Sequence, residues 1–403
     1  MLSARRPRGP VKRKAPASRI SRAIALWSMF AAAASLSAAL PASALTLEHK
    51  GLVAGWLVGR LERPVNPQAG ARFIPEFSLS QKVSGSFSLA GEFSFNGFGV
   101  ARFPSGEDAQ TDGDIEPYRF WLRLGTDRFE ARIGLQKINF GSASLLRPLM
   151  WFDSLDPRDP LQLTDGVYGV LLRYYFLNNT NIWAWALYGN DSPKGWEAVA
   201  TAKGTVEFGG RAQLPLWSGE LALTYHHRQF DIVPALAGPM SSAGERVPES
   251  RIGLDGKWDL GVGLWIEGTL THQESDLLPQ PWQRAFTVGL DYTFKWGNGL
   301  NVLGEHLRLD RGAKPFGPGD GTDFSALFFR YPVNTFVDLT AIFYYDWKEK
   351  DFYRFLSWQR TYDRWRFSII AFWNPDAFRI FPTQPGGNPF SGKGLQIMAA
   401  FNY

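Results

Sequence analysis

Apolar and polar residues alternate along most of this 403-residue chain, in blocks of about ten residues separated by Gly, Pro, Asp and Asn. In residues 86–96, for example, Phe87, Leu89 and Phe93 share one face, and polar residues such as Glu92 share the other. A period of two is typical of strands with one apolar face. The pattern predicts eighteen strands, over residues 50–61, 71–82, 86–99, 116–125, 127–139, 166–176, 180–188, 203–214, 218–228, 250–259, 262–272, 284–295, 299–309, 323–331, 335–346, 351–361, 364–374 and 393–403.

Short and long connections alternate between these strands. The short ones are 83–85, 126, 177–179, 215–217, 295–298 and 332–334, and the long ones are 100–115, 140–165, 189–202, 229–249, 273–283, 310–322 and 375–392. A β-sandwich also has alternating strands but has no reason for this rhythm, which is typical of a transmembrane barrel. We therefore predict an all-β fold, a transmembrane antiparallel up-and-down β-barrel of about 18 strands. Sixteen is the alternative, since 323–331 and 351–361 are the weakest strands.

The first 44 residues have a different composition from the rest of the chain. They hold eight basic residues and no acidic one, an apolar segment over 23–40, and the small residues Ala42-Ser43-Ala44 after Pro41. This predicts a signal peptide over 1–44, cleaved after Ala44, with the barrel over 45–403; a membrane anchor is the alternative. The formal charge of the whole chain is +5. Without the leader, 35 basic residues face 38 acidic ones, so the charge indicates no nucleic-acid partner.

The composition also excludes several kinds of chemistry. The chain has no Cys, which excludes disulfides, Cys-ligated zinc and c-type haem. The five histidines, His226 among them, accompany no Ser-based nucleophile motif, so we predict no enzyme; an outer-membrane hydrolase is a minor alternative. Asp153, Asp156 and Asp159 raise the alternative of a calcium site, but their spacing lacks the EF-hand pattern, and Asp beside Pro and Gly is ordinary turn chemistry. We therefore predict no metal and no cofactor.

The C-terminal segment alternates to its end. Leu395, Ile397, Ala399, Phe401 and Tyr403 share one face, and the last residue is aromatic. This resembles the terminal strand of bacterial outer-membrane proteins, whose final aromatic residue the barrel-assembly machinery recognises; an ordinary edge strand is the alternative. The expected partners are therefore this machinery, through Phe401 and Tyr403, and the outer-membrane lipid. Aromatic girdles are expected from residues near strand ends: Trp56, Tyr118, Tyr168, Tyr174, Phe176, Trp258, Trp296, Trp347, Trp365 and Trp373.

A local motif adds a family resemblance. Residues 132–141, which contain a strand with Gln136 and end at Gly141, are followed by Asp156-Pro157-Arg158-Asp159-Pro160. This arrangement resembles bacterial outer-membrane porins of the alginate-export type and related large barrels. The resemblance implies an outer-membrane channel for diffusion or export of small polar or charged solutes, with neither the solute nor the oligomeric state defined. A barrel that scaffolds a partner protein is the main alternative.

The longest connection, 140–165, is unusually apolar for a loop. Leu145, Leu146 and the segment 149–152 need something to pack against. In large porins the third external loop folds back and narrows the lumen, and the resemblance implies the same here. The candidate pore-lining and constriction residues are Arg119, Arg123, Arg132 and Arg173 on the wall and Arg147, Asp153, Asp156, Arg158, Asp159 and Asp165 in the loop. The alternative is that the wall arginines merely neutralise Glu92 and Glu130.

Overall fold

The computed structural model of the chain describes residues 45–61, 66–232, 244–375 and 390–403, and these form strands and no helix. The strands are β1 (Thr46–Arg60), β2 (Gln68–Ser84), β3 (Phe87–Arg102), β4 (Gln110–Gly125), β5 (Phe129–Gln136), β6 (Val167–Tyr175), β7 (Asn181–Tyr188), β8 (Val206–Leu216), β9 (Gly219–Asp231), β10 (Arg246–Asp259), β11 (Gly263–Gln273), β12 (Trp282–Phe294), β13 (Leu300–Gly312), β14 (Gly319–Asn334), β15 (Val337–Asp346), β16 (Asp351–Tyr362), β17 (Trp365–Trp373) and β18 (Lys393–Asn402). The predicted number of eighteen is confirmed. The predicted signal peptide, 1–44, lies outside the described residues.

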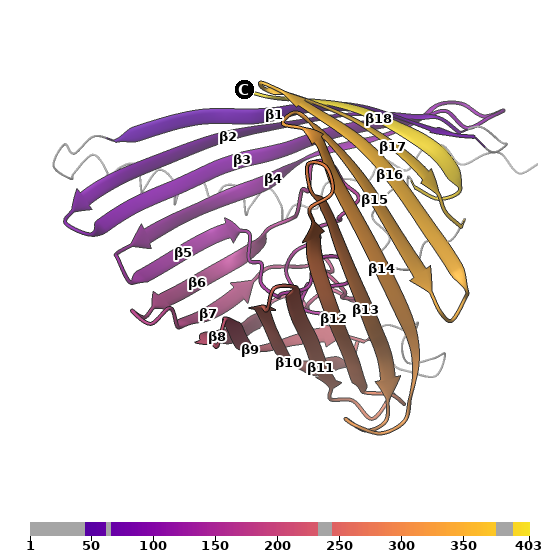
Figure 1. Ribbon diagram of the computed structural model, residues 1–403. Coiled ribbons are helices and arrows are strands. Elements are labelled where there is room, and N and C mark those ends of the chain that lie inside the picture. Colours follow the sequence, from indigo (N-terminus) through magenta and orange to yellow (C-terminus); the bar gives the residue numbers. More distant parts are fainter. Residues whose placement is uncertain (1–44, 62–65, 233–243, 376–389) are drawn as a thin grey trace, which may run out of the picture. The chain divides into compact units, whose positions relative to one another are not determined.

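The sheet closes on itself (Figure 1). Each strand pairs antiparallel with its neighbours in sequence, and β18 pairs with β1. At this seam Leu52 lies opposite Asn402, and the backbones of Gly51 and Tyr403 exchange two hydrogen bonds of 3.1 Å. Closure leaves no edge strand, which is the condition for spanning a bilayer with strands. The predicted fold class, an antiparallel up-and-down β-barrel, is confirmed.

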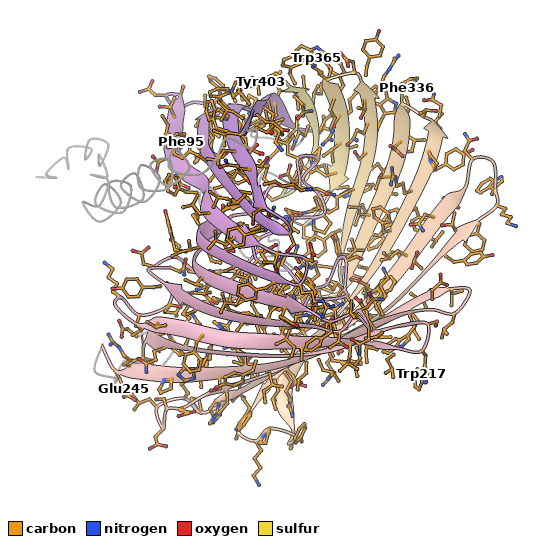
Figure 2. The ribbon with its side chains drawn as sticks, turned by 90° about the vertical axis from the view of Figure 1, so that its left-hand side faces the viewer. Phe95, Trp217, Glu245, Phe336, Trp365 and Tyr403 are labelled. Atoms are coloured by element: carbon orange, nitrogen blue, oxygen red, sulfur yellow. The ribbon has the colours of Figure 1, made fainter. Side chains whose placement is uncertain are left out.

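Short turns and long loops lie at opposite ends of the strands. Trp217 in the β8–β9 turn and Glu245 in the β9–β10 connection mark the two ends (Figure 2). Several strands extend further into the long-loop end than predicted, and the longest extensions are those of β4, which begins at Gln110, β10, which begins at Arg246, and β14, which begins at Gly319. The extensions of β4 and β14 consist mostly of polar residues and Gly, so they carry no alternation from which a strand could be predicted. The extension of β10 contains Pro248 and the buried Val247.

The outer face of the barrel is apolar. Leu223, Leu290, Leu327 and Leu356 are all exposed, as are apolar residues of nearly every other strand. Such a surface suits the hydrocarbon of a bilayer and would be a liability in water. Among the described residues, no helix is long and apolar enough to cross a membrane.

Aromatic residues near strand ends divide into two groups. Trp296, Trp347 and Trp373 are exposed, as expected for a girdle. Trp56, in contrast, packs against an apolar cluster on the inner face, so the expectation that it belongs to a girdle is wrong. The reason is alternation: Trp56 shares the face of the buried Ala54 and Val58.

Candidate functional site

The third loop, residues 137–166 between β5 and β6, lies inside the barrel and contacts the far wall. Ser142 Oγ donates a hydrogen bond to Asp255 on β10 (3.0 Å), and Thr287 Oγ1 on β12 donates to the carbonyl of Leu146 (2.7 Å). Around the barrel, β7, β8 and β9 separate β6 from β10. These bonds therefore cross the enclosed space, where Figure 1 shows the loop between the two walls.

Two carboxylates of the far wall, Glu267 on β11 and Glu305 on β13, hold the backbone of the third loop. Their partners are five backbone N–H groups at 2.5–2.9 Å: Ala143 and Leu149 donate to Glu267, and Ser144, Leu145 and Leu146 donate to Glu305. The indole of Trp265 also donates to Glu305 (3.0 Å). Successive N–H groups that point the same way form a nest for an anion, and here the barrel wall supplies the anion.

The apolar residues of the third loop are buried in two clusters. Leu145 and Leu146 pack with inward-facing side chains of β13–β17, among them Tyr344 and Phe355. On the other side, a second cluster joins the loop to β6 and β7; its members are Ile138, Phe140, Leu149, Trp151, Phe152, Val167, Leu171, Trp185 and Leu187. Burying a side chain of this size contributes about 1.5–3 kcal/mol. This packing accounts for the apolar composition of the loop.

The acidic residues of the third loop are engaged within the loop itself. Arg147 binds Asp153 through two nitrogens (2.6 and 3.0 Å), and Arg158 binds Asp156 through two (2.7 and 2.5 Å). Asp159 accepts the backbone N–H of residue 161 (2.9 Å), and burial raises the pKa of its carboxyl. The candidate Asp165 lies 3.4 Å from the hydroxyl of residue 154.

The four candidate wall arginines divide into an anchor and a cluster. Arg119 donates to the carbonyl of Thr164 (2.8 Å) and so holds the end of the third loop. Arg123, Arg132 and Arg173 all approach the carboxylate of Glu130 instead, at 3.8, 3.0 and 3.5 Å. The alternative that these arginines neutralise Glu130 therefore agrees with these contacts in part. With one carboxylate for three guanidinium groups, however, the neutralisation is incomplete.

A second inward loop was missed by the sequence reading. The fourth loop, residues 189–205 between β7 and β8, packs onto the third through Trp196, whose indole donates to the carbonyl of Arg147 (2.8 Å). Its charged side chains enter a buried network with the wall: Lys194 with Glu207 at 3.1 Å, and Glu197 with Arg228 and Arg251 at 3.2 and 3.0 Å. This loop begins with the polar residues Asn190-Asp191-Ser192, which are typical of an exposed segment, so nothing in the sequence indicated that the loop turns inward.

Gly195 of the fourth loop lies directly against Met150 of the third loop, and we expect Gly195→Ala to separate the two loops. Its φ is +48°, and an added Cβ would lie 1.6 Å from the carbonyl oxygen of Met150, so the backbone has to move. The expected result is a lower thermal transition in detergent, measured by circular dichroism. Gly204→Ala is the matched control, because Gly204 has a φ of +77° but open space around it. Equal transitions for the two variants would contradict tight packing of these loops.

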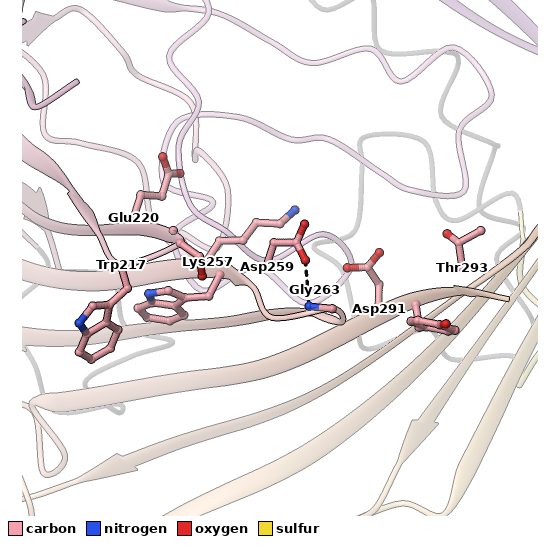
Figure 3. Close-up of a pocket in the computed structure, with 12 residues that line it drawn as sticks. Trp217, Glu220, Lys257, Asp259, Gly263, Asp291 and Thr293 are labelled. Carbon is pink, nitrogen blue, oxygen red and sulfur yellow. Dashed lines mark hydrogen bonds between the residues drawn. The ribbon is translucent and has the colours of Figure 1, made fainter. Parts of the chain in front are cut away.

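A cavity of about 750 Å³ opens at the short-turn end of β8–β12 (Figure 3). Its lining combines the basic Lys257 with the acidic Glu220, Asp259 and Asp291 and with the indole of Trp217. Asp259 accepts the backbone N–H of residue 261 in the turn (3.1 Å). The mixed charge is that of a hydrated mouth and indicates no particular ligand. Within the described ranges, no group of three or more His, Cys, Asp or Glu is placed to hold a metal ion.

Comparisons with known proteins give a structural likeness only. No family model matches the chain, and no curated protein matches it. Among solved structures, it is similar to OmpT, an outer membrane protein of Vibrio cholerae in its trimer form, with 12% identity, a TM-score of 0.52 and coverage of 90% of this chain and 100% of that one. OccD3 (OpdP) of Pseudomonas aeruginosa is similar at 10% identity and a TM-score of 0.51, over 88% and 91% of the two chains. The chain therefore has the fold of a bacterial outer-membrane β-barrel, closed here by eighteen strands.

Proposed function

We propose that the chain is an outer-membrane channel for small polar or charged solutes, narrowed by its third loop. The observation that carries the proposal is the combination of an apolar outer face with a loop bonded across the enclosed space. Barrels of this size leave an aqueous channel unless something fills them. The third and fourth loops fill part of the interior, and the proposed path is the space that they leave.

The proposal also assigns an orientation and partners. Short turns face the periplasm in outer-membrane barrels, so the β8–β9 turn with Trp217 would face it here. The apolar outer face would contact lipid. At the C-terminus the ring of Phe401 is tilted against that of Trp365, with 4.8 Å between the ring centroids, and Tyr403 follows the strand that closes the barrel. We propose that these two residues are read by the barrel-assembly machinery.

A conductance measurement tests the channel. Purified residues 45–403, folded in detergent and added to a planar bilayer, are expected to give discrete current steps in 1 M KCl, because an open barrel conducts ions. Folding is checked by the shift in gel mobility between unheated and heated samples. Folded protein that gives no current steps would refute the channel and leave the scaffold alternative.

A further inference from the structure

Two serine–histidine pairs face outward from the barrel, near the long-loop end of the strands. Ser325 on β14 lies opposite His306 on β13, with 2.9 Å between Oγ and Nδ1. Ser250 on β10 lies opposite His227 on β9, with 3.1 Å between the same two atoms. The proposed channel uses neither pair. A nucleophile within hydrogen-bond reach of a base is the minimal arrangement for acyl transfer, so each pair is a candidate for chemistry.

A carboxylate distinguishes the first pair from the second. Asp323, two residues before Ser325 on the same face of β14, has its Oδ1 3.7 Å from Nε2 of His306. Among the described residues, no carboxylate lies within ion-pair distance of His227. A serine that acts as a nucleophile gives up its proton, so Nδ1 of His306 accepts and the ring proton lies on Nε2, towards Asp323. Ser325, His306 and Asp323, the outer triad, thus stand in the order of nucleophile, base and carboxylate.

Two further side chains fix the outer triad in place. The indole N–H of Trp347 donates to Oγ of Ser325 (2.9 Å), where it would stabilise the negative charge that develops on this oxygen. Nη1 of Arg308 contacts both carboxylate oxygens of Asp323, at 2.9 and 3.2 Å, and holds them beside the histidine. The side chains of His306 and Arg308 are about half exposed, so a substrate can reach them.

The outer triad lies on the lipid-facing side of the wall, at the edge of the apolar band. Leu307, the next residue after His306, is buried against the third loop, and alternation along β13 therefore turns His306 outward. Leu327, two residues after Ser325, is exposed on the same outer face. Trp347, on the other side, belongs to the aromatic girdle, which marks the level of the lipid headgroups. The triad is thus at the depth of the bonds that join acyl chains to headgroups.

We propose that the outer triad is a catalytic site that cleaves acyl esters of membrane lipids, on the outside of the barrel and separate from the channel. Ser325 and His306 are the catalytic residues, and Asp323 is a positioning residue that stabilises the charged imidazole. Strand pairing brings the three side chains together (β13 and β14 in Figure 1), so no local motif in the sequence indicates them. The inference goes beyond the proposed channel and does not depend on it.

The reaction needs only the ester and water. Oγ of Ser325 attacks the ester carbonyl carbon while its proton passes to Nδ1 of His306. The bond between the carbonyl carbon and the alcohol oxygen then breaks, and the alcohol leaves with that proton. Water attacks the acyl-serine with His306 again as the base, which releases the fatty acid and restores the hydroxyl group.

A long-chain sulfonyl fluoride tests the nucleophile. Hexadecanesulfonyl fluoride, incubated with protein purified from membranes in detergent, is expected to modify Ser325: the Oγ–S bond forms, the S–F bond breaks, fluoride leaves, and His306 takes the proton. Mass spectrometry of peptides locates the modified residue. His306→Gln is expected to slow the labelling by at least about 100-fold, the usual contribution of a general base. Ser250→Ala is the matched control and is expected to be labelled at the wild-type rate.

Release of palmitate from dipalmitoyl phosphatidylethanolamine in mixed detergent micelles is the second readout. Ser325→Ala is expected to abolish it, and Ser250→Ala to leave it unchanged. Asp323→Asn is expected to lower kcat at least about tenfold without a change in KM, because the carboxylate acts on the charged imidazole of the transition state and not on the bound lipid. A parallel assay of 3-hydroxy fatty acid released from lipopolysaccharide distinguishes the two lipid sources of the ester.

Equal labelling and equal fatty-acid release by wild type and Ser325→Ala, both folded as judged by gel mobility, would overturn the catalytic site. Labelling of Ser250 in place of Ser325 would do the same. The channel is tested separately, since Ser325 lies outside the barrel and Ser325→Ala is expected to keep the wild-type conductance. Absence of current steps would refute the channel and leave the result for the outer triad standing.

Discussion

Deletion of residues 150–160 is expected to raise the single-channel conductance several-fold. The segment contains Trp151 and Phe152, which pack beside β6 and β7, and it contains the ion pair of Arg158 with Asp156 and the Asp153 partner of Arg147. Its removal would take bulky side chains out of the enclosed space. The conductance of a pore rises with the cross-section of its narrowest part.

The deletion is designed to leave the barrel wall intact. Leu145 and Leu146 remain, and with them the bonds to Glu305 that keep the start of the loop in place. Removal of residues 105–108, in the exposed connection between β3 and β4, is the control and is expected to leave the conductance unchanged. If the two deletions gave the same conductance as the wild type, the third loop would not narrow the path.

Glu305→Gln is expected to turn a steady channel into a flickering one with a higher mean conductance. The carboxylate of Glu305 accepts from three backbone N–H groups of the loop. The glutamine side chain keeps one acceptor oxygen and places an NH₂ group, itself a donor, against these N–H groups. A buried N–H group that loses its acceptor costs roughly 1–3 kcal/mol. The loop start would then detach from β13 part of the time, and single-channel noise spectra would record this motion.

Glu220→Gln provides the matched control, since Glu220 lines the open cavity at the short-turn end and bonds only a glutamine in the described structure, Gln213 (2.5 Å). This variant is expected to have wild-type noise. The thermal transition of Glu305→Gln is also expected to fall, because the bonds are part of the folded structure. A quiet Glu305→Gln channel of unchanged conductance would show that the apolar cluster alone fixes the loop.

Alternation was sufficient to predict all eighteen strands, since a wall between lipid and a polar interior imposes a period of two on every strand. It failed at strand ends, among them ends where that contrast is missing. At the start of β4, Thr111 to Asp114 extend beyond the apolar band, so both faces are polar. The start of β10 differs, because it contains Pro248 and the buried Val247, which packs with Phe230 and Ile232.

The site was predictable only in part. The apolar third loop indicated that it needs a packing partner, but Glu267 and Glu305 occur at ordinary polar positions of the alternating pattern. No local signal shows how far around the barrel the loop reaches. One feature of the sequence did indicate a partner inside the barrel. From Ala341 to Tyr345, β15 is apolar on both faces, which is typical of a strand buried on both sides. That strand carries part of the inner apolar cluster.

The seam between β1 and β18 has a consequence for the order of assembly. Every other strand pairing joins strands that follow one another in sequence, so the sheet can grow hairpin by hairpin with little loss of chain entropy. The seam alone joins residues as distant as Leu52 and Asn402. The third and fourth loops can contact β10–β13 before β1 and β18 pair. The interior can therefore be filled while the sheet is still an open ribbon, and the two bonds between Gly51 and Tyr403 then seal a barrel that already contains its loops.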